Sequence, residues 1–80
     1  MQQNKQDAAK AAEVAARFQR QAKIGRERLG YSIREMAEQV GVSSSHVMFI
    51  ESGRRFPSLP IILGYSRVLR TRPARLLFGK

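Results

Sequence analysis

The sequence predicts a small all-α domain of five helices, the first of which is alanine-rich and longer than the others. Three observations predict this fold class. The chain has 80 residues, which is the size of a single domain. Apolar residues recur at helical spacings of three and four along most of it. Serines and glycines stand before and after these apolar runs, as helix caps do.

The first helix is expected to start near Asp7, whose side chain can cap it, and to run to about Leu29. Seven alanines within this segment favour a helix, because alanine has the highest helix propensity. Gly25 lies on the apolar stripe and indicates a close approach by another helix, and Gly30 ends the run. The apolar stripe consists of Val14, Phe18, Ala22 and Gly25.

Two short helices are expected next. Ser32 and Glu35 have the spacing of a capping box, and Gly41 ends the helix that they open. Ser43 caps the following helix and Gly53 ends it. Two short helices joined by a turn that contains glycine must cross steeply, which is the helix-turn-helix arrangement. Their apolar stripes consist of Ile33, Met36, Ala37 and Val40, and of Val47 and Ile50.

The fourth helix is expected from Ser58 to about Leu69, and Thr71 is expected to cap a fifth helix with Pro73 in its first turn. The fourth helix is apolar on two sides, so it needs two packing partners. The side expected to face the core consists of Leu59, Ile62, Leu63, Ser66 and Leu69. The other side consists of Ile61, Tyr65 and Val68, and it is expected to meet the fifth helix or a second subunit.

Composition excludes several classes of protein. The chain has no cysteine, which excludes disulfides, zinc fingers and a thiolate nucleophile. One histidine and scattered carboxylates cannot easily build a metal site, and so short a chain has few walls for an enzyme pocket. No apolar run is long enough for a membrane span, and the first residues lack the apolar core of a signal peptide. We therefore expect no metal, no cofactor, no small-molecule ligand and no membrane partner.

The charge of the chain is strongly positive and unevenly placed. Fifteen lysines and arginines against six acidic residues give a formal net charge of +9. Residues 52–80 carry seven of the basic side chains and no acidic one. Such a block attracts polyanions, so from charge alone the partner could be nucleic acid, an anionic membrane surface or an acidic protein, and a merely solvated surface is the alternative. The alanine-rich stripe is too weakly apolar for a helix that binds a membrane surface.

The segment of residues 32–53 resembles the helix-turn-helix of the phage Cro and repressor family, also called the Xre-like family. The resemblance extends from about Phe18 to Phe78. It implies a lambda-repressor-like DNA-binding domain over residues 18–80, preceded by an extension over residues 1–17 that is partly disordered or helical. The matching positions are Arg26, Ala37, Gly41, Val47, Ile50, Glu51, Gly53 and Pro57.

The resemblance also assigns roles to single residues. In the family, Arg26 and Glu51 form a structural ion pair that joins the first and third helices. The expected base-reading residues are Ser44, Ser45 and Phe49, with Met48 close by. The expected phosphate-contacting residues are Ser43, Arg34, Arg54, Arg55 and His46. Ile33, Met48, Phe49 and Ser52 depart from the residues that are frequent in the family.

The physics of the pattern agrees with these roles. A recognition helix presents its first residues to base edges in the major groove, where small or hydrogen-bonding side chains such as the serine triplet fit. Phe49 either contacts a thymine methyl group or folds back onto Phe56 or a neighbouring helix as additional core. His46 either contacts DNA or is partly buried. Ser45 and His46 form no hydrolase pair, because neighbours in a helix point about 100° apart.

We therefore expect a sequence-specific regulator of transcription without enzymatic activity that binds double-stranded DNA. The resemblance implies a homodimeric repressor of phage, plasmid or restriction-modification type on an inverted-repeat operator. It would be cytoplasmic in a bacterium and associated with the nucleoid when bound, with RNA polymerase as a further candidate partner. An antitoxin or protein-interaction module with the same fold is the alternative. The expected dimer interface consists of Ile61, Tyr65, Leu76, Leu77 and Phe78.

Overall fold

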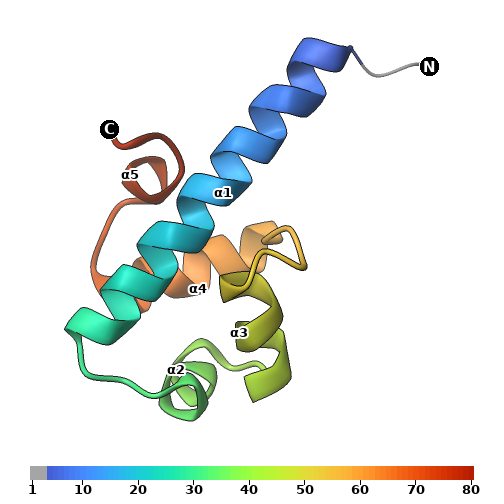
Figure 1. Ribbon diagram of the computed structural model, residues 1–80. Coiled ribbons are helices and arrows are strands. Elements are labelled where there is room, and N and C mark those ends of the chain that lie inside the picture. Colours follow the sequence, from blue (N-terminus) through green and yellow to red (C-terminus); the bar gives the residue numbers. More distant parts are fainter. Residues whose placement is uncertain (1–3) are drawn as a thin grey trace.

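The computed structural model describes residues 4–80, which form five helices and no strand (Figure 1). The all-α prediction is therefore confirmed. No helix in this part of the chain is long and apolar enough to cross a membrane. Residues 1–3, which are part of the extension predicted to be partly disordered or helical, lie outside the described residues. The helices are α1 (Lys5–Arg28), α2 (Ile33–Val40), α3 (Ser44–Glu51), α4 (Leu59–Leu69) and α5 (Pro73–Phe78).

Helix α1 starts earlier than predicted, because Asn4 rather than Asp7 is its N-cap. The Asn4 side chain accepts a hydrogen bond from the N–H of Gln6 at 2.7 Å, and Asp7 lies in the first turn, where its charge favours the helix dipole. The helix runs without a break past the expected boundary between residues 17 and 18. Residues 4–13 are all exposed, and this end projects beyond the other helices (Figure 1).

The two halves of the helix-turn-helix are capped as the sequence predicts. Ser32 and Glu35 form a reciprocal capping box with hydrogen bonds of 2.9 and 3.0 Å. Gly41 has φ +89°, a left-handed conformation that ends α2 and turns the chain into α3. The Ser43 side chain then accepts a hydrogen bond from the N–H of His46 at 3.1 Å. These local interactions set the positions at which α2 ends and α3 begins.

The core takes buried side chains from all five helices, and it corrects the predicted orientation of α4. Tyr65 is fully buried, and its ring makes an edge-to-face contact with Phe18 at 5.5 Å between ring centres. Ile61 and Ile62 are buried as well, whereas Leu59 and Leu63, which were expected to face the core, are 66% and 51% exposed. Of that predicted core side, Ile62 is the residue that is buried.

Three of the five expected dimer contacts belong to the protomer's own core. Ile61, Tyr65 and Leu76 are buried within the protomer, so their side chains are closed to a second subunit. Leu77 is half-buried and Phe78 is 52% exposed. Of the five residues predicted, these two are open to a partner.

A glycine in α1 lets α4 approach closely, and N-cap residues set the starts of α4 and α5. A Cβ added to Gly25 of α1 would lie 2.7 Å from Cδ1 of Leu69 in α4, so the close approach predicted from this glycine occurs. Ser58 is the N-cap of α4, as predicted, although its side chain makes no capping hydrogen bond. Arg72 rather than Thr71 is the N-cap of α5, and Pro73 occupies the first turn.

A buried charged cluster joins α1, α3 and α4. Arg26 Nε donates to both carboxylate oxygens of Glu51, at 2.9 and 3.1 Å, and Arg26 Nη1 donates to the Tyr31 carbonyl at 2.8 Å. The Tyr65 hydroxyl donates to Glu51 Oε2 at 2.8 Å. Burial and then the Glu51 carboxylate raise the pKa of Tyr65, so its hydroxyl keeps the proton that it donates. The structure thus brings Arg26 and Glu51 together and adds Tyr65 to them.

Removal of Glu51 should be the most destabilising single change in this cluster. Glu51→Ala leaves the Arg26 charge buried without its partner and should lower the free energy of unfolding by about 3–5 kcal/mol. Tyr65→Phe removes one hydrogen bond to a charged group and should cost about 1.5 kcal/mol. Chemical denaturation followed by circular dichroism measures both values.

Glu38→Ala is the matched control, because Glu38 pairs with Arg34 on the surface at 3.8 Å with both side chains exposed. It should cost about 0.5 kcal/mol or less. Equal losses for Glu51→Ala and Glu38→Ala would contradict the structural role of the buried cluster.

The capping box makes stability depend on pH. The backbone N–H and then the side chain of Ser32 lower the pKa of Glu35 below its ordinary value of 4.5. The folded state therefore binds this proton less readily than the unfolded state, and the resulting stabilisation is lost as the pH falls below 4.5 through the lowered pKa. Ser32→Ala should bring the pKa of Glu35 closer to its ordinary value and flatten the pH dependence of the unfolding free energy in this range.

Denaturation at several values between about pH 6 and 3 tests this expectation. Ser58→Ala is the matched control, since Ser58 is also an N-cap but makes no capping hydrogen bond through its side chain. A steeper pH dependence in Ser32→Ala than in the unchanged protein would contradict the assigned sign.

Candidate nucleic-acid interface

The start of α3, directly after the turn that joins it to α2, is polar and exposed. Ser43, Ser44 and Ser45 are all exposed. Ser43 uses its side-chain oxygen to cap the helix, which orders the first turn. The N–H groups of Ser44 and Ser45 precede the first backbone hydrogen bond of the helix, which Val47 donates to the Ser43 carbonyl. Such N–H groups, at the positive end of the helix dipole, suit a phosphate oxygen.

The outer face of α3 carries two apolar side chains. Met48 is 53% exposed and Phe49 is 38% exposed, while Val47 and Ile50 on the opposite face are buried in the core. Phe49 lies outside the buried core. The guanidinium carbon of Arg54 lies 6.0 Å from the centre of the Phe49 ring, at the outer limit of a cation–π contact. The ring is therefore presented outward with a cation above it.

The turn after α3 holds two arginines in place. The backbone N–H groups of Arg54 and Arg55 both donate to the Phe49 carbonyl, at 3.0 and 3.3 Å, and both residues are exposed. Gly53, at φ +81°, makes this turn. A Cβ at Gly53 would lie 2.7 Å from Oε1 of Gln19 in α1, so the turn also approaches α1 closely. The arginine pair is thus fixed beyond the C-terminal end of α3.

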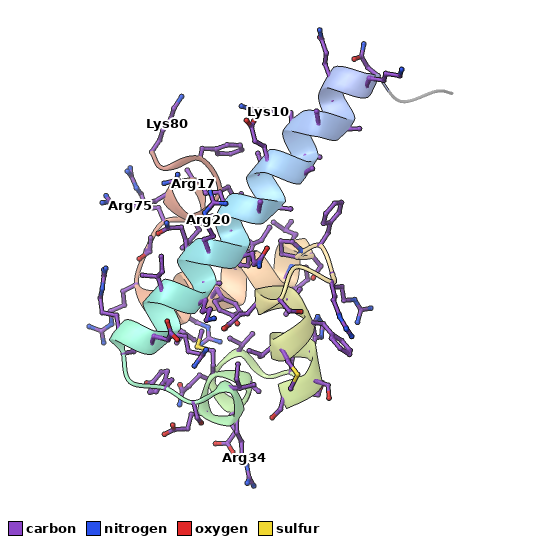
Figure 2. All side chains as sticks on the ribbon, in the orientation of Figure 1. Lys10, Arg17, Arg20, Arg34, Arg75 and Lys80 are labelled. Atoms are coloured by element: carbon purple, nitrogen blue, oxygen red, sulfur yellow. The ribbon has the colours of Figure 1, made fainter. Side chains whose placement is uncertain are left out.

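The other expected phosphate contacts lie on different parts of the surface. Arg34, in the first turn of α2, has a side chain that is 85% exposed and lies 3.8 Å from Glu38. Figure 2 places it at the end of the molecule away from the cations of α1 and α5. His46 in α3 is half-buried. Its side chain is thus partly covered, as one of the two alternatives from the sequence has it, and partly open to a DNA contact. The structure therefore brings together the serines, Met48 and Phe49 on one helix, and it places Arg34 on the neighbouring one.

Sequence reasoning missed two features of the molecule. The Tyr65 hydroxyl was not expected to bind Glu51. A group of cations from α1 and from the end of the chain was not expected to lie together, although Arg75 was weighed as a DNA-backbone contact against a solvated surface. The spacing of Arg17 and Arg20 indicates that these two share a face of α1, but no local pattern predicts which residues near α5 join them. Within residues 4–80, no cluster of histidine, aspartate and glutamate side chains could hold a metal ion.

The comparisons with known proteins agree with this geometry. Residues 5–77 match the family model of the helix-turn-helix domain. Neither a curated protein nor a solved structure matches the chain. The matched family is Xre/Cro-like, and its members are DNA-binding domains rather than enzymes. Because the match spans most of the sequence, the chain belongs to the helix-turn-helix family of DNA-binding domains.

Proposed function

We propose that this protein is a sequence-specific regulator of transcription that binds double-stranded DNA as a homodimer and represses the promoter it occupies. The observation that carries the proposal is the exposed outer face of α3, which opens with three serines and continues to Phe49. An α-helix fits the major groove, and its first residues then reach the base edges. Repression follows from occlusion of RNA polymerase and needs no chemistry by the protein.

Base reading and phosphate contact fall to different residues in this proposal. Ser44 and Ser45 supply hydrogen-bonding groups to base edges, and Phe49 and Met48 supply apolar contact to thymine methyl groups. Phosphates are contacted by groups around the helix, which fix its register on the duplex without reading sequence. These groups are Ser43, His46, Arg34, Arg54 and Arg55.

The dimer in this proposal uses an apolar groove under the projecting end of α1. The groove has a volume of about 480 Å³, and its walls include Val14 of α1, Phe56 of the α3–α4 connection, and Leu77 and Phe78 of α5. Phe56 is 67% exposed, so much of this apolar surface is open to water. In a helix-turn-helix dimer that reads two half-sites, the recognition helices lie about 34 Å apart, one turn of DNA.

Such a dimer suits an inverted-repeat operator. A small regulator of phage, plasmid or restriction-modification type, controlled by its own concentration through dimerisation, fits this arrangement. Selection of bound sequences from a random DNA pool is the experiment that tests the function. It should return one symmetric site with a fixed spacing between half-sites, and recovery of unselected sequences would overturn the proposal.

Substitution of the arginine pair should weaken binding to all DNA sequences alike. Arg54→Ala with Arg55→Ala removes two phosphate contacts, so the slope of log affinity against log salt should become shallower by about 1.8. Fluorescence anisotropy with the selected site and with a scrambled duplex measures this slope.

Phe49→Ala is the contrasting variant. Because Phe49 is half-exposed and outside the core, the fold should survive while the preference among sites changes. The assignment of phosphate and base contacts would be reversed if the arginine variant lost affinity for the selected site alone.

Introduction of a charge into the groove should separate the subunits. Phe78→Glu places a carboxylate in the proposed apolar interface, so the protein should elute as a monomer and lose at least about tenfold in affinity for the symmetric site. Size-exclusion chromatography with light scattering measures the mass.

Leu59→Glu is the matched control, because Leu59 is also exposed, at 66% against 52% for Phe78, but does not line the groove. It should leave the dimer intact. A dimer that persists in Phe78→Glu and separates in Leu59→Glu would place the interface on α4 instead.

A further inference from the structure

A row of cations runs along the seam between α1 and α5. On α1 it contains Arg17, Arg20 and Arg28, which share one face of the helix, and on the C-terminal side it contains Arg75 and Lys80. Figure 2 shows four of these side chains, those of Arg17, Arg20, Arg75 and Lys80, gathered on this side of the molecule. We call these five residues the seam cations.

The seam cations have no acidic partners. Among residues 4–80, none of the five lies within 4.0 Å of a carboxylate in a salt bridge. Lys10 and Glu13 also belong to this face, but they pair with each other at 3.4 Å, so that together they add no net charge. Like charges held close together destabilise a fold by mutual repulsion. An anion at the seam would remove that repulsion.

Arg17 is held at the centre of this arrangement. Its Nε atom is buried and donates no hydrogen bond to any residue of the described chain. The guanidinium packs so closely on Gly79 that a Cβ at that position would collide with its Nη2. This arginine is therefore packed against the chain after α5 rather than free in solvent, and its hydrogen-bonding capacity is not used up within the protein.

The seam is hollowed along its length. One hollow, of about 630 Å³, is lined by Arg17, Arg20 and Lys80. It shares Val14, Leu77 and Phe78 with the proposed dimer groove, but none of the seam cations lines that groove. A second, of about 290 Å³, is lined by Arg28 and Arg75 and by no carboxylate. From Arg17 to Arg28 the helix rises by about 16 Å, at 1.5 Å per residue. That length corresponds to about five base pairs of duplex DNA at 3.4 Å each.

The seam faces away from the recognition helix. Helix α1 packs against α3 on one side and against α5 on the other, so it separates the two surfaces (Figure 1). An anion at the seam is therefore a separate ligand or a distant segment of the same DNA.

We propose that the seam cations form a second DNA-binding surface, which holds the phosphate backbone of another duplex segment without reading its sequence. The inference rests on the proposed function, because it takes DNA as the polyanion at hand. A row of cations from two elements matches the regular charges of a phosphate backbone better than the few carboxylates of a peptide. Once α3 is bound, remote segments of the same molecule are at high effective concentration.

A sandwich assay tests the proposal. A biotinylated duplex of the selected site is immobilised, the protein is bound to it and washed, and a fluorescent duplex of unrelated sequence is added at increasing salt. The unchanged protein should capture the second duplex. Arg20→Gln with Arg75→Gln, two exposed positions, should reduce that capture about tenfold and make its salt slope shallower by about two.

The charge-matched control is Lys5→Gln with Arg67→Gln, which removes two exposed cations that line neither hollow of the seam and should leave capture unchanged. The inference is overturned if Arg20→Gln with Arg75→Gln captures the second duplex as well as the unchanged protein, since a second recognition helix of the dimer would then hold it. It is also overturned if a helical peptide of leucine and glutamate binds the seam and no duplex does. Failure of the first duplex to retain the protein would overturn the proposed function itself, together with this inference.

Discussion

The buried cluster of Arg26, Glu51 and Tyr65 is the interaction on which the arrangement of the helices depends. It ties α1, α3 and α4 to one another, and through the Tyr31 carbonyl it also fixes the connection between α1 and α2. Glu51 is the last residue of α3, so the cluster anchors the recognition helix at the end opposite to its serines. The orientation of the serine end therefore depends on a carboxylate that is buried inside the domain.

The buried cluster costs desolvation free energy, and it also favours one arrangement of the helices over others. A charged pair that leaves water loses its hydration, and good geometry offsets that loss only when the remaining lone pairs are also satisfied. Glu51 accepts three hydrogen bonds, two from Arg26 and one from Tyr65, which meets that condition. The cluster thus favours one arrangement of three helices over others in which a charge would be buried without its partners.

Local features of the fold could be predicted from the sequence, and features that depend on distant contacts could not. The capping box of Ser32 and Glu35 and the left-handed Gly41 act within a few residues of one another, so their pattern is visible in the sequence. Helix α4 has two apolar sides, and counting apolar residues does not choose between them. The choice depends on Tyr65, whose hydroxyl needs the carboxylate of a residue fourteen positions earlier.

The same division holds for the candidate site. The serine triplet directly follows the turn between α2 and α3, and the arginine pair lies in the turn after α3. The resemblance to known repressors identified both groups. The contact of Arg54 with the Phe49 ring and the seam between α1 and α5 arise from packing. Because Arg54 lies over the Phe49 ring, the two side chains constrain each other's position. Arg54 is the one expected to contact phosphate, and Phe49 is the one expected to contact a base edge.

The projecting end of α1 has a consequence for motion. Its first turns, over residues 4–13, are exposed and bury no side chain against the other helices. A helical segment whose side chains are all exposed is held mainly by alanine propensity and by the Asn4 cap, and these interactions alone leave short helices marginal in water. Amide protons there should exchange through fraying of the helix end, at rates uncoupled from global unfolding, whereas those around Phe18 and Ala22 should exchange only when the whole domain opens.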